Sequence, residues 1–457
     1  MGESLFQKTL TLPVSAEAAF AWHERPGAFR RLQPPWEPLE VVATAASLRP
    51  GHRVSLVSRL GPLRLPMVFE HGAYEAGCLF TDRQIRGPFA SWIHEHRFRN
   101  GKNRPVMEDH IRYTVPGGRL GELVAGKAIR RRIERMFAYR HRITLYDLAM
   151  PPITPQTLLI TGNSGFIGRA VSAYFSTRGH TVKGLSRSPE GPEEIGWDPE
   201  RGVLRTEDLE GIDAVIHLAG EPIDQRWDAA AMSRIRKSRK LGTRLLAERL
   251  AKLKRPPRVL LCASGINYYG DRREEPVDES SDPGSSYLAD VCVEWEAACE
   301  PARQAGIRVV QMRTGVVLDP RGGALKKLVP IFKSGLGGKV GSGKQRMSWI
   351  LLEEIPLVME FLLGKEGVEG PVNLVAPQVV TNAEFSKTLG KALGKPAAVP
   401  VPAVAIRMAY GKMGKATILG DLAVSPIRLE ENGYAFRYPD LEEGLRFILG
   451  KSLHEAG

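Results

Sequence analysis

The sequence is poor in cysteine and has no long apolar segment. Its four cysteines, at positions 78, 262, 292 and 299 of 457, are scattered without the paired spacing of a zinc site. They are also too few for a disulfide framework, which favours a reducing compartment. No apolar run approaches the ~18 to 20 residues of a membrane helix, and the first residues lack the order of a secretory signal. We therefore expect a cytoplasmic protein without a transmembrane segment.

Acidic residues are outnumbered, most strongly in the first third of the chain. The formal net charge is +13, and residues 1–150 carry 23 Lys and Arg against 14 Asp and Glu. Part of this excess lies in residues 130–142, where arginines are interleaved with the apolar Ile133, Met136 and Phe137. That pattern is typical of a solvated helix face beside a buried stripe. We favour this interpretation over a nucleic-acid surface and expect no nucleic-acid partner.

The chain is too long for one ordinary core, and a proline-rich segment divides it. Residues 1–150 have the pattern of strands separated by Gly and Pro turns, with a short helix capped by Ser15 and a closing helix over 130–148. This order predicts an α+β domain in which a curved sheet wraps around the long helix. Residues 151–156 contain three prolines and are expected to be a stiff linker.

From residue 157 onward, strands and helices alternate. The expected strands are 157–161, 180–185, 214–218, 259–263 and 309–313, and the expected helices are 166–178, 229–253 and 287–304. This alternation predicts an α/β fold with a doubly wound parallel sheet. We assign residues 157–395 to this domain. Residues 396–450 are expected to complete a small C-terminal lobe on the substrate side.

A glycine-rich turn, Thr-Gly-Asn-Ser-Gly-Phe-Ile-Gly at 161–168, directly follows the first of these strands. Gly162 permits a tight turn, Gly165 lets the backbone approach a pyrophosphate, and Gly168 lets the next helix pack closely. The helix N-terminus then faces the anion. Because strand, turn and helix occur in the required order, we interpret the segment as a Rossmann dinucleotide site and not as a merely flexible loop. The cofactor-binding residues predicted here are Gly162, Ser164, Gly165, Phe166, Ile167 and Gly168.

The end of the second strand indicates which dinucleotide is bound. An acidic residue there binds the ribose 2′-hydroxyl of NAD, whereas an arginine accommodates the 2′-phosphate of NADP. This strand leads into Ser186 and Arg187 without a carboxylate. We therefore predict NADP, with both residues on the 2′-phosphate; an ordinary exposed turn arginine is the alternative.

A turn of small residues at the end of strand 214–218 is expected to border the same ligand. Its cofactor-binding residues are Leu218, Ala219 and Gly220. His217, inside the apolar strand, is expected to be a packed core residue and not a catalyst.

These motifs resemble the extended short-chain dehydrogenase/reductases, whose glycine pattern is Thr-Gly-x-x-Gly-Phe-Ile-Gly. Further segments are similar to an atypical epimerase-like subfamily with a C-terminal conserved domain of unknown function. They are residues 217–223, 226–227, 264–270, 345–350, 373–377, 382–385 and 436–439. The resemblance implies NADP-dependent hydride transfer on an unidentified carbonyl or sugar-like small-molecule substrate.

The resemblance also implies a catalytic hydroxyl, a tyrosine and a lysine. Ser264 fits the substrate-orienting hydroxyl and also borders the cofactor, and Tyr287 fits the proton-transferring phenol. The lysine expected four residues after the tyrosine is absent, because that position is Val291. Without a neighbouring cation a tyrosine keeps a pKa near ~10 and is a poor base at neutral pH. Two functions stay open: an NADP-dependent epimerase or oxidoreductase, and a catalytically decayed NADP-binding or redox-sensing protein.

The first 150 residues resemble the START and polyketide-cyclase-like (SRPBCC) helix-grip superfamily. The similar segments are 32–36, 87–96 and 139–142. The resemblance implies a ligand-binding domain for a small apolar molecule. His94 and His96 share one face of a strand and are two potential metal ligands, but no third ligand can be identified from the sequence. We therefore expect a polar wall or a structural pair and no metal; the oligomeric state is left open.

Overall fold

The computed structural model describes residues 3–60, 63–101, 104–273 and 275–451, and these form two compact units. The first unit contains the described residues up to Thr154 together with Ala173–Gly179. The second contains Pro155–Ser172 and His180–Lys451. Within the described ranges, no helix combines the length and the apolarity that crossing a membrane requires.

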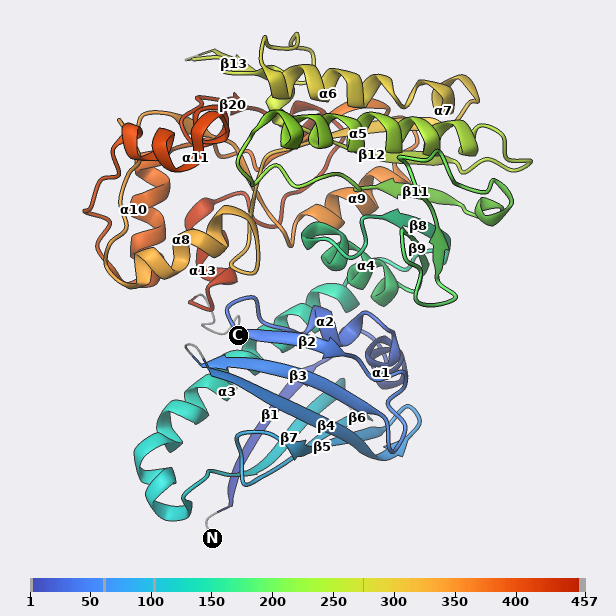
Figure 1. Cartoon of the computed structure of the whole chain (residues 1–457). Helices are drawn as coiled ribbons and strands as arrows, with labels where there is room; N and C mark the ends of the chain where they lie inside the picture. The colour runs from blue at the N-terminus through green and yellow to red at the C-terminus, as the bar shows by residue number, and fades with distance from the viewer. Residues whose placement is uncertain (1–2, 61–62, 102–103, 274, 452–457) are drawn as a thin grey trace. The chain divides into compact units, whose positions relative to one another are not determined.

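The first unit is built on a seven-stranded antiparallel sheet with the strand order β1-β7-β6-β5-β4-β3-β2 (Figure 1). Its elements are β1 (Ser4–Thr11), α1 (Ala16–Glu24), α2 (Ala28–Arg31), β2 (Leu39–Ala43), β3 (Arg53–Leu60), β4 (Leu63–Glu75), β5 (Leu79–Arg86), β6 (Ser91–Asn100), β7 (Pro105–Thr114) and α3 (Gly118–Leu148). The predicted cap of α1 is confirmed, because the Ser15 side chain accepts a hydrogen bond from the Ala18 N–H. An α+β domain closed by a long helix is therefore present.

Helix α3 begins at Gly118, well before the predicted start at residue 130. Its early apolar residues Leu120, Leu123 and Val124 are exposed, so they form no buried stripe that periodicity could detect. Later in the helix, Ile133 and Phe137 are buried, as the interleaved pattern predicted.

The interior of the first unit is lined by alternate residues of β6. Trp92, His94, His96 and Phe98 are buried, whereas the residues between them are partly or fully exposed. Around Phe98 the packing is aromatic: its ring centroid lies 5.3 Å from that of Phe20 in α1, in an edge-on arrangement. The period-two pattern thus brings two histidines into an apolar core.

The second unit is built on a seven-stranded parallel sheet with the order β10-β9-β8-β11-β12-β14-β18. The strands and the helices between them are β8 (Thr157–Thr161), α4 (Phe166–Arg178), β9 (Thr181–Ser186), β10 (Glu194–Gly196), η1 (Glu207–Leu209), β11 (Ala214–His217), α5 (Ala229–Leu250), β12 (Val259–Gly265), η2 (Ile266–Tyr269), α6 (Tyr287–Ala297), α7 (Glu300–Gln304), β14 (Arg308–Thr314), α9 (Ile355–Gly364) and β18 (Gly370–Leu374). The order reverses between β8 and β11, so a ligand is expected at the carboxyl ends of these two strands.

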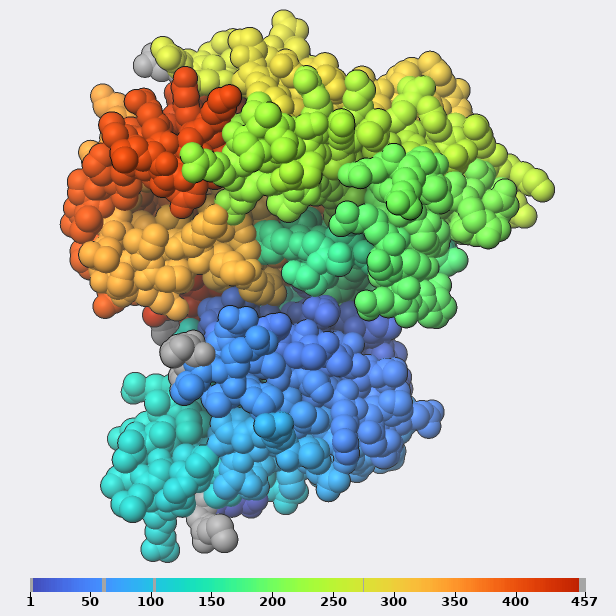
Figure 2. Space-filling model, viewed as in Figure 1, coloured from blue at the N-terminus to red at the C-terminus, as the bar shows by residue number. Residues whose placement is uncertain are grey.

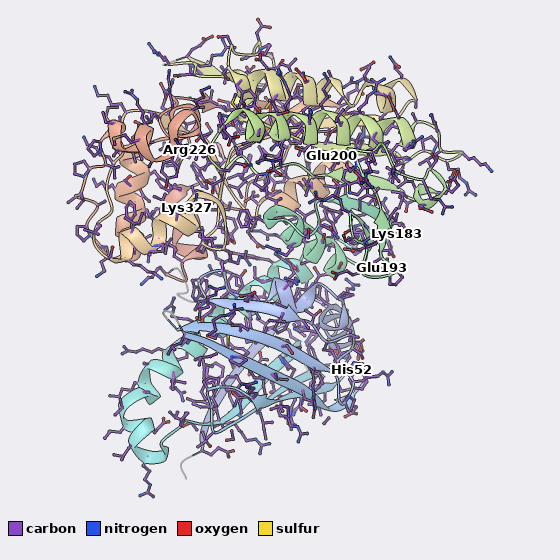
Figure 3. All side chains as sticks on the ribbon, viewed as in Figure 1. His52, Lys183, Glu193, Glu200, Arg226 and Lys327 are labelled. Carbon is purple, nitrogen blue, oxygen red and sulfur yellow. The ribbon has the colours of Figure 1, made fainter. Side chains whose placement is uncertain are left out.

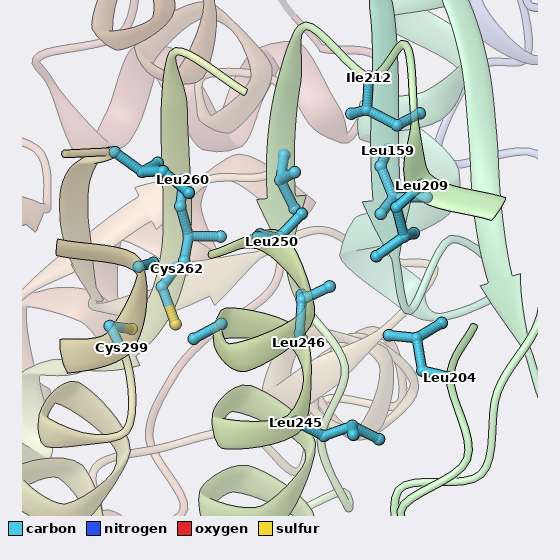
Figure 4. Packing of buried hydrophobic residues seen from close by; sticks show 14 of the residues in the cluster. Leu159, Leu204, Leu209, Ile212, Leu245, Leu246, Leu250, Leu260, Cys262 and Cys299 are labelled. Carbon is cyan, nitrogen blue, oxygen red and sulfur yellow. The ribbon is translucent and has the colours of Figure 1, made fainter. Parts of the chain in front are cut away.

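Most predicted elements of this sheet are confirmed, and one is wrong. The helix expected over 287–304 is two helices, because α6 ends at Ala297 and α7 starts at Glu300 with Pro301 in its first turn. Helices α5 and α6 lie side by side over one face of the sheet (Figure 1), and their side chains form a closed surface in Figure 2. Figure 4 shows leucines of α5 packed on the strands.

The remaining elements form a small lobe of helices and two-stranded sheets. They are β13 (Pro276–Val277), β15 (Val316–Leu318), α8 (Gly323–Lys333), β16 (Arg346–Met347), β17 (Trp349–Leu351), β19 (Val380–Thr381), α10 (Asn382–Leu393), α11 (Ala403–Thr417), β20 (Ala423–Val424), α12 (Ile427–Glu431) and α13 (Leu441–Ile448). Buried Glu354, which precedes α9, joins the segment between α12 and α13 of this lobe to the sheet, since its carboxylate accepts hydrogen bonds from the Tyr434 hydroxyl (2.5 Å) and the Tyr438 N–H (3.0 Å). Burial raises the pKa of Glu354 above its ordinary value.

Candidate functional site

The glycine turn after β8 has the tight geometry that the sequence predicted. Gly162 has φ +65°, and a Cβ atom there would lie 3.0 Å from the Ala219 nitrogen. The Gly165 N–H closes the turn by donating to the Gly162 carbonyl (2.9 Å). A Cβ atom on Gly168 would come within 2.0 Å of the same carbonyl oxygen. Gly162 and Gly168 therefore allow the backbone of the turn to pack closely against neighbouring backbone atoms. The pyrophosphate contact of Gly165 stays a prediction.

Helix α4 starts directly after this turn, at Phe166. Its first-turn N–H groups have no acceptor within the helix, and the partial positive charge of the helix end lies beside exposed Ser164 and Gly165. This arrangement suits an anion. Phe166 extends to the small lobe, where a Cβ atom on Gly322 would clash with its ring at 2.3 Å.

Thr161 fixes the turn that follows β11. Its Oγ1 accepts hydrogen bonds from the backbone N–H groups of Leu218 and Ala219, both at 3.0 Å. The same hydroxyl lies 2.7 Å from His217 Nδ1, and His217 Nε2 lies 2.9 Å from Thr243 Oγ1. The predicted loop residues Leu218, Ala219 and Gly220 are thus placed across from Gly162 at the edge of the sheet.

His217 is fully buried in β11. Burial lowers its pKa to about 4, so the ring is neutral at physiological pH. A neutral ring that accepts from the Thr161 hydroxyl and donates to Thr243 satisfies both nitrogens. The expectation of a packed core histidine is confirmed.

Ser186 is the last residue of the neighbouring strand β9, and Arg187 directly follows it. Arg187 is exposed, and the Ser186 hydroxyl accepts a hydrogen bond from the Ser188 N–H (3.2 Å). A hydrogen bond from Gln225 and the charges of Arg234 and Arg187 hold the pKa of the Glu221 carboxyl below its ordinary value. Arg187 therefore lies within electrostatic range of the residue that follows the Leu218–Gly220 turn.

Asn163 belongs to this edge as well, and sequence reasoning missed it. A Cβ atom on Gly184 of β9 would lie only 2.3 Å from Asn163 Nδ2. The small residue at position 184 leaves room for the amide between two strands. A glycine inside an apolar strand, which often marks a close approach, was the available signal.

Ser264 lies near the carboxyl end of β12 and is almost completely buried. Its hydroxyl donates to Glu296 Oε1 at 2.7 Å. The Glu296 carboxylate in turn binds Arg313 of β14 in a two-pronged ion pair, with nitrogen–oxygen distances of 2.9 and 2.8 Å. The predicted hydroxyl is therefore held by a buried charge pair that sequence reasoning missed.

The pair continues into a longer polar network. Arg313 Nη1 donates to the Tyr269 hydroxyl (3.0 Å), which donates to Asn373 Oδ1 (2.7 Å). The guanidinium carbon also lies 3.4 Å from the ring centroid of Tyr268. Burial raises the pKa of Tyr269 to about 12, so this phenol stays protonated as a donor. Strand 308–314 carries two arginines, Arg308 and Arg313, among otherwise uncharged residues, and the charge at position 313 was the one sign of this network in the sequence.

Tyr287 begins α6, and its surroundings differ from those of Ser264. Its hydroxyl donates to the Met232 carbonyl, and its ring packs at 5.5 Å from that of Trp227. Val291, where a lysine was expected, is buried in α6. Burial raises the pKa of Tyr287 above its ordinary value. The hydroxyls of Ser264 and Tyr287 thus have separate protein partners.

The loop after β11 is tied to helix α8 by an exposed ion pair. Lys327 Nζ lies 2.6 Å from Asp224 Oδ1. Figure 3 labels Lys327 on α8 and Arg226 in the loop. This loop directly follows Gly220, so the small lobe contacts the segment that borders the predicted cofactor site.

Comparison with known proteins gives two family matches. The NAD dependent epimerase/dehydratase family matches residues 158–374, and a domain of unknown function, DUF1731, matches residues 401–448. An epimerase family protein of Mycobacterium bovis is 40% identical over 290 residues, which cover 63% of this chain and 96% of that protein. Apart from Ala173–Gly179, the residues of both family matches belong to the second unit.

Two crystal structures are also similar. The human epimerase family protein SDR39U1, solved with NADPH, has a TM-score of 0.60 at 33% identity and covers 64% of this chain and 99% of its own. A nucleoside-diphosphate sugar epimerase from Corynebacterium glutamicum has a TM-score of 0.79 at 31% identity, covering 97% of this chain and 90% of its own. The second similarity includes the antiparallel sheet of the first unit.

Proposed function

This chain belongs to the epimerase family, and we propose that it is an NADP(H)-dependent epimerase or oxidoreductase. The reaction is hydride transfer between the nicotinamide and a carbonyl or carbinol carbon of a small-molecule substrate. The observation that carries the proposal is the turn from β8 into α4, in which Gly162 and Gly168 hold the backbone in the form an anion-binding helix end requires. NADPH in the human relative supports the choice of cofactor.

The residues at the edge of the sheet fit a dinucleotide. The helix end at Ser164, Gly165 and Phe166 would hold the pyrophosphate, and exposed Arg187 with Ser186 would hold the 2′-phosphate. The Leu218–Gly220 turn would lie against the rest of the molecule. When bound, the nicotinamide supplies or accepts the hydride; everything else comes from the protein.

On the substrate side, Ser264 would orient the reacting oxygen. Glu296 accepts a hydrogen bond from the Ser264 hydroxyl (2.7 Å) and is itself held by Arg313, so the orientation of the serine hydroxyl is fixed. Tyr287 would exchange the proton. To do so its hydroxyl must leave the Met232 carbonyl to which it is bonded here.

A second candidate is a protein that holds NADP(H) without turning over a substrate. The observation in its favour is the environment of Tyr287, whose hydroxyl is engaged by a backbone carbonyl while buried Val291 supplies no cation to lower its pKa. Such a protein would act as a redox-sensing or binding module.

Isotope transfer separates the two candidates. The full chain is incubated with NADPH deuterated at the nicotinamide C4 and a panel of simple carbonyl compounds, and separately with NADP+ and a panel of nucleotide sugars; products are analysed by mass spectrometry and NMR. An enzyme of the proposed kind places deuterium in at least one carbonyl compound or converts at least one nucleotide sugar into its epimer or its oxidised form. Binding of the cofactor without either change supports the second candidate, and failure to bind NADPH contradicts both.

For the first unit we propose the helix-grip fold and a small apolar ligand. Support comes from its seven antiparallel strands and its long final helix, together with the aromatic lining around Phe20 and Phe98. The ligand would lie between the sheet and α3. Uptake of a fluorescent apolar probe, lost when Phe98 is replaced by Asp, tests this proposal.

A further inference from the structure

The interior of the first unit contains a cluster of charged and titratable side chains among its aromatic residues. The members, called the histidine–aspartate cluster, are Asp82 of β5, His94 and His96 of β6, Asp109 of β7 and His141 of α3. The Asp109 side chain is 1% exposed, and the His94 side chain 3%. Buried carboxylates persist in a protein core only when they are paired or bound to a metal.

Strand register brings these residues together. Asp82 is paired with His94 across β5 and β6, and His96 is paired with Asp109 across β6 and β7. Paired residues of adjacent strands point to the same face of the sheet, and positions 94 and 96 share that face as well. The four side chains are therefore neighbours because of the sheet itself and not because of a mobile loop.

Each imidazole faces both aspartates. His94 Nδ1 lies 3.2 Å and His96 Nε2 lies 3.8 Å from the same Asp82 oxygen, Oδ2. The opposite nitrogens, His94 Nε2 and His96 Nδ1, lie 3.0 and 2.8 Å from Asp109 Oδ1. A neutral imidazole carries one N–H and one lone pair, so it cannot donate to two carboxylates. On one side of each ring, a lone pair must therefore face an acceptor, unless that ring is protonated on both nitrogens or a metal cation lies between the two groups.

We propose that the first unit binds one divalent first-row transition-metal ion, of the zinc or iron(II) class, through Asp82, His94 and His96. One donor atom from each of these residues lies within 4.8 Å of the others. Donors about 2.0 Å from a tetrahedral zinc ion are about 3.3 Å apart, close to the observed separations from Asp82. Two imidazoles with one carboxylate form a donor set that such ions favour, whereas calcium and magnesium prefer oxygen alone.

Asp109 has the place of the supporting carboxylate. Metal-binding histidines commonly donate their second N–H to a carboxylate, which orients the ring. Asp109 Oδ1 is hydrogen-bonded to His94 Nε2 (3.0 Å) and lies 2.8 Å from His96 Nδ1 as a charge contact without hydrogen-bond geometry, and its other oxygen is 2.6 Å from His141 Nε2. The free nitrogens of His94 and His96 therefore face Asp82, where the ion would lie.

The Asp82 side of the cluster offers access, and a third histidine lies beside it. The Asp82 side chain is 17% exposed against 1% for Asp109, so an ion would enter from that side. His71 is paired with Asp82 across β4 and β5, and its buried Nδ1 has no hydrogen-bond partner. His71 therefore lies beside the cluster, while the donor atoms that come within 4.8 Å of one another are those of Asp82, His94 and His96.

Metal titration of the full chain tests the proposal. The protein is stripped with a chelator, and Zn²⁺ is titrated by calorimetry with Mg²⁺ in excess; bound metal is then counted by mass spectrometry. The matched control is His110→Gln, a histidine next to Asp109 on β7 whose Nδ1 pairs with Gln7. We expect one bound equivalent in the wild type and in the control, and its loss in Asp82→Asn and His96→Gln. Asp109→Asn should bind 10- to 100-fold more weakly, as loss of an orienting carboxylate does.

Two outcomes would overturn the proposal: a stripped wild type that takes up no equivalent of Zn²⁺, or ligand variants that bind as the control does. A cluster held by protons alone gives the first of these results. If the ligand variants do not fold, the visible absorption spectrum of the wild type with Co²⁺ tests whether the metal site exists. Intense visible bands of a four-coordinate nitrogen and oxygen site support the proposal, and the spectrum of hydrated Co²⁺ contradicts it.

Discussion

Gly168 lies directly against the carbonyl oxygen of Gly162, so that a Cβ atom on Gly168 would stand 2.0 Å from that oxygen. Contact at this distance is impossible, and the loop or the helix would have to move. We predict that Gly168→Ala weakens NADPH binding at least ~10-fold, because the helix end shifts from the anion position. Equilibrium titration of cofactor fluorescence measures the change. Gly191→Ala is the control, since a Cβ atom there meets nothing within 4 Å, and equal affinity of the two variants would count against the assigned turn.

The buried pair of Glu296 and Arg313 should be important for stability. The Arg313 side chain is 3% exposed, so removing its partner leaves a charge without compensation. We expect Glu296→Gln to lower the free energy of unfolding by about 3 kcal/mol or more, measured by urea denaturation. Glu248→Gln removes the exposed partner of Arg244 and should change the free energy of unfolding by about 0.5 kcal/mol or less. Similar losses in both variants would contradict the role given to the network.

His217 should make the second unit less stable in mild acid. Its folded pKa of about 4 lies below the unfolded value, near ~6.5, so the unfolded chain binds more protons between these limits. The stability that comes with a neutral His217 is fully present above pH ~6.5 and is lost as the pH falls from ~6.5 to about 4. We expect the free energy of unfolding to fall by about 2 kcal/mol between pH 7 and pH 5. Urea denaturation at both values should show a smaller pH dependence in His217→Gln. An unchanged slope would mean that the ring is not held neutral.

Restoring the missing lysine should not restore a catalyst. Val291 is 2% exposed, so Val291→Lys places an ammonium group in the core. There the charged lysine destabilises the fold, or the lysine loses its proton and becomes neutral. We expect a lower unfolding midpoint and no gain in NADPH consumption on the substrate panel. Val293→Lys, at a position 39% exposed on the same helix, should leave both unchanged. Activation by the Val291 variant would show instead that the core tolerates a charged lysine at this position and that its charge lowers the pKa of Tyr287.

The turn and the sheet were predictable because their signals are local. The glycine spacing at 162–168, the Ser15 cap and the apolar strands each lie within a few residues of sequence. Strands β10 and β18 were missed because their local signals are weak or misleading. Strand β10 has only three residues, too few for a periodic pattern, and β18 begins with Gly-Pro, which normally signals a turn.

The partners of the site residues could not be predicted, because they come from other elements. Glu296 reaches Ser264 from α6, and Arg313 reaches Glu296 from β14. Asp82 joins His94 and His96 only through the register of β5 and β6, which no local pattern specifies. The search for a third ligand in the sequence failed for that reason.

The central claim, that this edge of the sheet holds NADP(H), is tested most directly by calorimetric titration of NADPH and NADH into the wild type and Arg187→Ala. We predict one equivalent of NADPH, bound more tightly than NADH. Arg187→Ala should weaken the binding free energy of NADPH by about 1.5 to 3 kcal/mol and leave that of NADH unchanged, because the charge-assisted contact with the 2′-phosphate is removed. Failure of the wild type to bind either dinucleotide, or equal affinity for both in wild type and variant, would contradict the account.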